Sequence, residues 1–188
     1  HTVIEKAEWV DTLPIRTAHS ELPLELRNFG TEEELEQKVA ETKTAYEDLY
    51  ARYGTSTNRE EYYLWQNANL KMLGAEDQLG YIRMQKNGTK IELLDDENPC
   101  EIQVFRLGGT CVIGVQGEVF VEYALYLKAV AGFGTVIFNE LSNGVLPGYL
   151  YTPESLVTGG YETDTSMLAE SFGRHMVEKA LETIQQVK

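Results

Sequence analysis

Two places in the sequence combine residues that could carry out chemistry. The first is Gln116-Gly117-Glu118, which follows an apolar run at 111–115 and precedes a helical pattern. In α/β folds, ligands usually bind where a strand ends and the chain turns into a helix. The field of a helix N-terminus keeps a carboxylate ionised and suited to a cation. The alternative is that Glu118 is an ordinary first-turn glutamate, since acidic residues are enriched at that position.

The second place is a long stretch without periodicity at 140–164, rich in Gly, Pro, Asn and Thr. It contains Tyr149, Tyr151 and Tyr161, whose phenols can donate or accept hydrogen bonds or bind a metal. Structureless segments of this length are usually functional or disordered, and three tyrosines argue against disorder. A surface loop packed by its own aromatic rings is the alternative interpretation.

A helical hairpin is predicted ahead of both places, over about 31–85. Capping boxes begin it at Thr31-Glu32-Glu33-Glu34 and begin its second helix at Thr57-Asn58-Arg59-Glu60, and Gly54 ends the first helix. Apolar stripes at helical spacing follow the two boxes: Leu35, Val39, Thr42, Tyr46, Leu49 and Tyr53, then Trp65, Ala68, Met72, Ala75, Leu79 and Ile82. Two stripes joined by a short loop indicate an antiparallel pair, whose ordinary role is packing.

Short β-type runs replace the helical period after residue 89. They lie at 91–94, 102–105, 111–115 and 136–138, with Gly108-Gly109 as a hairpin turn, and one or two strands within 1–27 would need partners outside this chain.

We expect a helix from Glu118 to about Val130, and an amphipathic helix closes the chain over about 166–187. The switch of period predicts an α/β (or α+β) fold with a mixed sheet, flanking helices and the antiparallel hairpin. The chain is a single domain or the C-terminal part of a larger catalytic domain, with its sheet and active-site loops at about 90–164.

Composition narrows the class of protein. The 188 residues carry a formal net charge of −14, which repels phosphate backbones and argues against a nucleic-acid partner. No apolar run reaches the roughly 18 residues of a membrane span. Cys100 and Cys111 match no zinc-cysteine spacing and form no disulfide framework.

Four short motifs in order resemble the active-site region of the neutral/alkaline ceramidases. They are Gly117-Glu118-Val119-Phe120, Leu141-Ser142-Asn143, Tyr149-Leu150-Tyr151-Thr152 and, twelve residues after Tyr149, Tyr161-Glu162. The likeness covers most of the chain, although its motifs lie within 117–162. Gln116 stands where that family usually has Pro. The stretch from Asn143 to Tyr149 is about one residue longer than usual, and the segment between Glu118 and Asn143 is shorter than in the animal enzymes.

The resemblance implies a Zn²⁺ site made of two His, one Glu and one Tyr. It assigns Glu118 and Tyr149 as metal ligands and makes Tyr161 the catalytic residue that faces the substrate carbonyl. The two His ligands are expected from a part of the protein absent here, since His1, His19 and His175 fit neither position. His175 is expected to be a surface or packing residue. Zn²⁺ in such a site activates water for attack on an amide carbonyl, and this chain alone would be inactive.

The resemblance therefore implies a secreted or periplasmic zinc amidohydrolase of sphingolipid metabolism. Its substrate would be a ceramide-like lipid amide, and its partners would include the missing N-terminal part and, peripherally, a membrane. Two alternatives stay open: a non-catalytic protein-interaction module of the same fold, and a degenerate member that keeps the fold without hydrolysis. Convergence of Glu118 and Tyr149 on one cleft would favour the enzyme, because zinc ligands lie about 2 Å from the metal.

Overall fold

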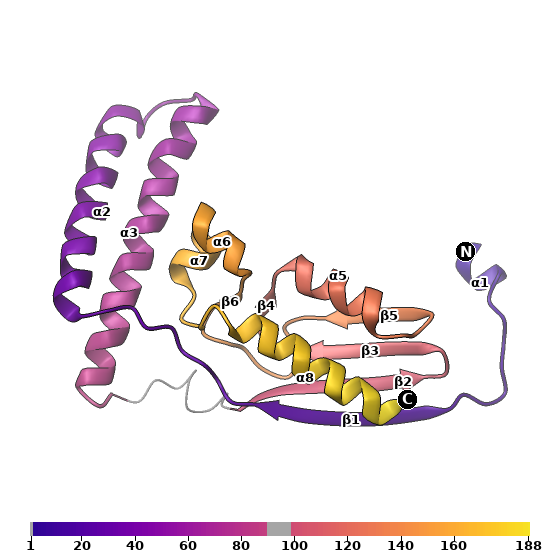
Figure 1. Ribbon diagram of the computed structural model, residues 1–188. Helices are drawn as coiled ribbons and strands as arrows, with labels where there is room; N and C mark the ends of the chain where they lie inside the picture. The colour runs from indigo at the N-terminus through magenta and orange to yellow at the C-terminus, as the bar shows by residue number, and fades with distance from the viewer. Residues whose placement is uncertain (1, 90–98) are drawn as a thin grey trace.

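The computed structural model describes residues 2–89 and 99–188 of the chain. Within those residues, a four-stranded sheet in the order β1-β2-β3-β5 carries α5 and α8 on one face (Figure 1). A long hairpin of α2 and α3 stands at one end of this layer (Figure 1). The structure confirms the predicted α/β class, with a mixed sheet and an antiparallel helix pair.

The sheet is mixed because its strands β1 (Ile15–Leu22), β2 (Cys100–Leu107) and β3 (Thr110–Val115) are antiparallel, whereas β5 (Thr135–Asn139) runs parallel to β3. Gly108, at φ +60°, lies in the β2–β3 turn, as predicted. The expectation that the N-terminal strand needs a partner from outside the chain is wrong. All eight residues of β1 have register partners in β2. The strand predicted at 91–94 lies outside the described residues.

Alternation along β2 and β3 directs one apolar face of the sheet toward α5 (Val121–Val130) and α8 (Phe172–Val187). The resulting core includes Cys100, Ile102, Val104, Cys111, Ile113, Val115, Leu127, Phe172, Met176 and Ile184. Each fully buried large apolar side chain stabilises such a layer by roughly 1.5–3 kcal/mol. The side chains of both cysteines are buried in this core, and burial raises the pKa of Cys111.

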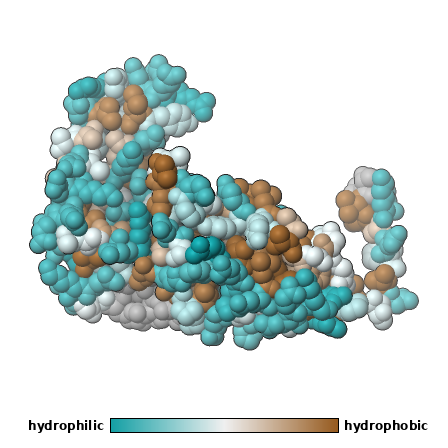
Figure 2. Space-filling model, in the orientation of Figure 1, coloured by the Kyte–Doolittle hydropathy of each residue, from teal (hydrophilic) through white to brown (hydrophobic). Residues whose placement is uncertain are grey.

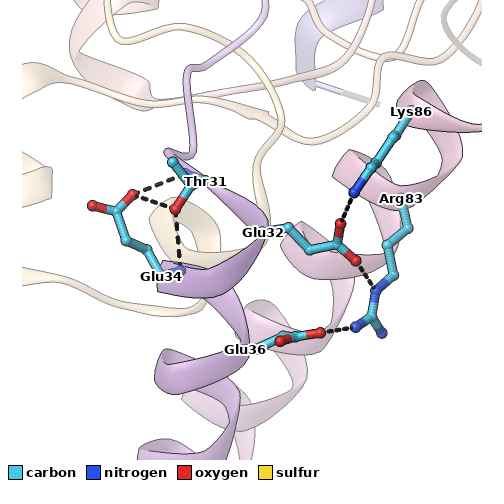
Figure 3. Close-up of polar contacts among 6 residues, drawn as sticks. All are labelled: Thr31, Glu32, Glu34, Glu36, Arg83 and Lys86. Carbon is cyan, nitrogen blue, oxygen red and sulfur yellow. Dashed lines mark hydrogen bonds and ion pairs between the residues drawn. The ribbon is translucent and has the colours of Figure 1, made fainter.

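The hairpin begins where its first capping box predicts. The Thr31 Oγ1 accepts from the Glu34 amide at 3.2 Å, and the Thr31 amide donates to Glu34 Oε2 at 2.8 Å (Figure 3). Helix α2 then runs over Glu32–Tyr53 and ends at Gly54. The second N-cap is Asn58 rather than Thr57, because the side-chain Oδ1 of Asn58 accepts from the Glu60 amide at 2.8 Å.

Helix α3 (Arg59–Lys86) returns along α2, and charges at its end meet the acidic start of α2 (Figure 3). Glu32 pairs with Lys86 at 2.6 Å and with Arg83 at 2.8 Å, and Arg83 also pairs with Glu36. Hydrogen bonds from Lys86 and then Arg83 lower the pKa of Glu32. Exposed pairs of this kind add little stability, but they join the start of α2 to the end of α3.

The predicted structureless stretch at 140–164 contains short elements instead. They are β6 (Tyr149–Leu150), α6 (Pro153–Thr158) and the first residues of α7 (Tyr161–Thr165). Another short helix, α1 (Thr2–Glu5), precedes the first strand. No helix among the described residues is long and apolar enough to cross a membrane.

Candidate functional site

Glu118 and Tyr149 are brought next to each other by a small parallel sheet. Residues Glu118–Val119 form β4, which pairs with β6 in the register Glu118↔Tyr149 and Val119↔Leu150. Register partners in a parallel pair direct their side chains to the same face, at strands about 4.8 Å apart. The two residues predicted to bind the metal therefore point to one side of the structure.

The helix after Glu118 begins later than predicted, at Val121, so Glu118 is not in its first turn. Gly117, at φ +79°, turns the chain out of β3. The Val119 amide then donates to Glu140 Oε2 at 2.8 Å instead of remaining a free helix amide. The position of Glu118 is consequently fixed by strand pairing and not by a helix terminus.

Tyr161 lies against Tyr149. Their ring centroids are 5.9 Å apart with an angle of 71° between the planes, an edge-to-face arrangement. Gly159 (φ +68°) and Gly160 (φ +149°) turn the chain into α7 and bring the Tyr161 ring to this place. Tyr161 is 43% exposed and Glu118 is exposed, so the cluster is open to a ligand.

The electrostatics of the cluster act mainly on Tyr149. Burial raises the pKa of its phenol, and the charge of Glu118 and a side-chain hydrogen bond to Glu118 raise it further. Tyr161 and Glu162 act in the same direction. Each of these effects favours the protonated form of the Tyr149 phenol.

Gln116 connects the segments that carry the cluster, a role that the sequence did not predict. It is 4% exposed; its Oε1 accepts from the Glu101 amide at 3.0 Å, and its Nε2 donates to the Asn143 carbonyl at 2.8 Å. The Leu141 amide also donates to the Gly117 carbonyl at 3.0 Å. The only signal in the sequence was a glutamine directly after an apolar run.

Tyr151, the other tyrosine of the predicted loop, is structural. It is 2% exposed, and its hydroxyl donates to the Leu168 carbonyl at 2.8 Å. Ser166, which the sequence did not single out, donates from its Oγ to the Tyr149 carbonyl at 2.8 Å. Buried polar side chains that bond to backbone in this way hold β6 in place.

The described histidines lie elsewhere. His175 Nδ1 is 2.7 Å from Glu25 Oε1, so it connects α8 to the segment before the hairpin. His19 is in β1, opposite Gln103, and His1 lies outside the described residues. Among residues 2–89 and 99–188, no group of three or more His, Cys, Asp or Glu could hold a metal.

The donor set at Glu118 and Tyr149 fits part of a zinc site. A carboxylate and a phenol oxygen are acceptable ligands for Zn²⁺, and the exposed cluster leaves room for others. Two protein ligands are fewer than zinc sites ordinarily use. The assignment of Glu118 and Tyr149 as ligands, and of Tyr161 as catalytic residue, stays a prediction that this geometry permits.

Comparison with known proteins found no matching family profile and no matching curated protein. Two solved structures are similar to the chain. One is a ceramidase complexed with C2, with 20% identity and a TM-score of 0.41 over 45% of this chain and 14% of that one. The other is a neutral ceramidase from Pseudomonas aeruginosa, with 14% identity and a TM-score of 0.48 over 91% and 28% of the two chains.

Both structures are ceramidases, the family that the sequence motifs resemble. The chain spans less than a third of the length of either one.

Proposed function

We propose that this chain is the C-terminal part of a zinc-dependent amidohydrolase similar to neutral ceramidase, which hydrolyses the N-acyl bond of ceramide-like lipids. The observation that carries the proposal is the β4–β6 register, which places Glu118 beside Tyr149, with the ring of Tyr161 against Tyr149. Three residues chosen from separate motifs thus meet on one exposed surface.

Within this proposal the three side chains have separate roles. Glu118 would supply the negative charge that compensates the dication, and Tyr149 would supply an oxygen ligand. Two histidines would come from an N-terminal part of the protein. Bound zinc would supply the Lewis acid that polarises an amide carbonyl and activates water.

Tyr161 has a different task, because its hydroxyl would donate a hydrogen bond to the charge that develops on the carbonyl oxygen. Its exposure at 43% leaves the phenol accessible to a substrate. Donors of this kind act on the transition state more than on substrate binding. The proposed setting is secreted or periplasmic, with peripheral contact to the membrane that holds the lipid.

The test compares variants of the full-length protein for zinc content and amide hydrolysis side by side. Glu118→Ala should lose the metal and, with it, hydrolysis. Tyr161→Phe should keep the metal and lower kcat on the order of 10²–10³-fold. The zinc content and activity of Tyr149→Phe should lie between those of the other two variants, since loss of a phenol ligand weakens zinc binding less than loss of a carboxylate.

Tyr126→Phe is the matched control, because Tyr126 is a half-exposed tyrosine on α5, outside the cluster. It should leave zinc and turnover unchanged. Full activity in Tyr161→Phe, or zinc and activity together in Glu118→Ala, would show that the roles carried over from the family are wrong. The interaction module would then be the better interpretation.

A further inference from the structure

The hairpin carries a groove that the proposed chemistry does not use. It has a volume of about 360 Å³. One wall consists of Thr42, Ala45 and Leu49 on α2. The other wall consists of Leu64, Asn67, Ala68 and Lys71 on α3. Four of these seven lining residues are apolar, and two of the four, Ala45 and Ala68, have small side chains.

A second, more polar pocket at the candidate site shares part of its lining with this groove. The second pocket has a volume of about 180 Å³, and its lining includes Tyr161 and Asp164 of α7. Asn67 and Lys71 line both cavities. The groove and the pocket that Tyr161 lines therefore lie next to each other along α3.

The two cavities keep a fixed relation because α7 is packed on α3, as Figure 1 shows. The Gln78 side chain donates from Nε2 to the Asp164 carbonyl. Gly74 allows the close approach, since a Cβ there would lie 2.8 Å from the same carbonyl oxygen. Tyr161, at the start of α7, is thus held in the pocket beside the groove.

We propose that the groove binds the acyl chain of an N-acyl lipid, with the polar amide end at Asn67, Lys71 and Tyr161. This assignment rests on the proposed function, because it takes Tyr161 as the residue that meets the amide. The arrangement matches an amphiphile: a mostly apolar groove lies beside a more polar pocket that the candidate catalytic phenol lines.

A hydrocarbon chain suits this groove better than an extended peptide. The backbone groups of α2 and α3 are already paired within their helices, so the walls offer no ladder of donors and acceptors to a peptide backbone. An alkyl chain needs no such partners and gains free energy from the apolar area it buries. The volume of the groove is also within the usual range for small-ligand sites.

The test fills the groove and measures the effect of chain length. Ala45→Phe places a ring in the channel, whereas Ala40→Phe makes the same change on α2 roughly 140° around the helix; both alanines are exposed. Binding and hydrolysis by the full-length protein are measured with an acetyl and a palmitoyl N-acyl sphingosine in detergent micelles. Ala45→Phe should weaken binding of the palmitoyl compound at least about tenfold and leave the acetyl compound unchanged. Ala40→Phe should change neither.

Leu64→Gln is a second variant, which puts a polar group into the opposite wall at a half-exposed position. Circular dichroism shows whether each variant folds. Equal effects on both acyl chains, or no effect in folded Ala45→Phe and Leu64→Gln, would overturn the groove assignment. Failure of the proposed function would give a different result. The wild-type protein would bind the palmitoyl compound, the groove variants would weaken that binding, and neither substrate would be hydrolysed.

Discussion

Among single residues, Gln116 connects the segments that carry the candidate site. Its amide bonds to the backbone of β2 on one side and to the loop before β6 on the other. Asn143, the loop residue that Gln116 contacts, lies six residues before Tyr149. The buried amide therefore affects the position of a proposed metal ligand without touching it.

Replacement of Gln116 by Ala should lower the free energy of unfolding by about 1–3 kcal/mol, because it leaves a buried amide N–H and a carbonyl without these partners. Urea denaturation measures this loss. Gln186→Ala, at an exposed position on α8, is the control and should change stability by less than about 0.5 kcal/mol. A Gln116→Ala variant as stable as the control would mean that water replaces both bonds at no cost.

The sequence predicted the three members of the cluster but not the residues that support them. Glu118, Tyr149 and Tyr161 belong to motifs with a fixed order and spacing. Gln116 and Ser166 act through hydrogen bonds to backbone groups 15 to 27 residues away. Such partners depend on the tertiary arrangement, which no local pattern encodes.

The elements show the same division between local and non-local signals. The hairpin was predictable because its caps and apolar stripes act within a few residues of each other. The strands β4 and β6 have two residues each and are paired across 31 positions of sequence. Their existence is a consequence of packing, so the sequence suggested a helix start at Glu118 and a loop at Tyr149 instead.

Two glycines in α3 provide a test of how its contact with α7 is made. Exchange of Gly for Ala inside a helix ordinarily adds about 0.5–1 kcal/mol of stability. Gly80→Ala should show this gain, since a Cβ there meets nothing within 4 Å. Gly74→Ala should instead destabilise the protein, because its Cβ would lie 2.8 Å from the Asp164 carbonyl oxygen and α7 would have to move.

The measurement is urea denaturation of both variants, with amide hydrolysis as a second readout. Displacement of α7 carries Tyr161 with it, so Gly74→Ala should also lower kcat while Gly80→Ala leaves it unchanged. An equal gain of stability in both variants would show that α7 is not packed on α3 in solution.

At the scale of the whole molecule, exposed apolar side chains gather on the outer face of one helix. Figure 2 shows brown side chains gathered over α5, where Val121, Leu125 and Val130 are exposed. Much of the remaining face in this view is hydrophilic (Figure 2), in keeping with the net charge of −14. Contiguous apolar surface of this kind commonly marks an interface. Helix α5 begins two residues after β4, so a neighbour on this face would also be close to Glu118.

Zinc titration of the chain separates its own contribution from that of the proposed N-terminal part. Glu118 and Tyr149 supply at most two protein ligands, whereas zinc sites normally use at least three. The phenol must also give up a proton whose pKa is raised by burial and by Glu118. We therefore expect the 188-residue chain to show no stoichiometric zinc binding at this cluster in isothermal titration calorimetry, and Glu118→Ala to give the same titration curve as the wild type. The full-length protein should bind zinc stoichiometrically and lose it in Glu118→Ala. Tight binding to the chain alone that disappears in Glu118→Ala would contradict this expectation, because a further ligand within the chain or from a second copy would then complete the site.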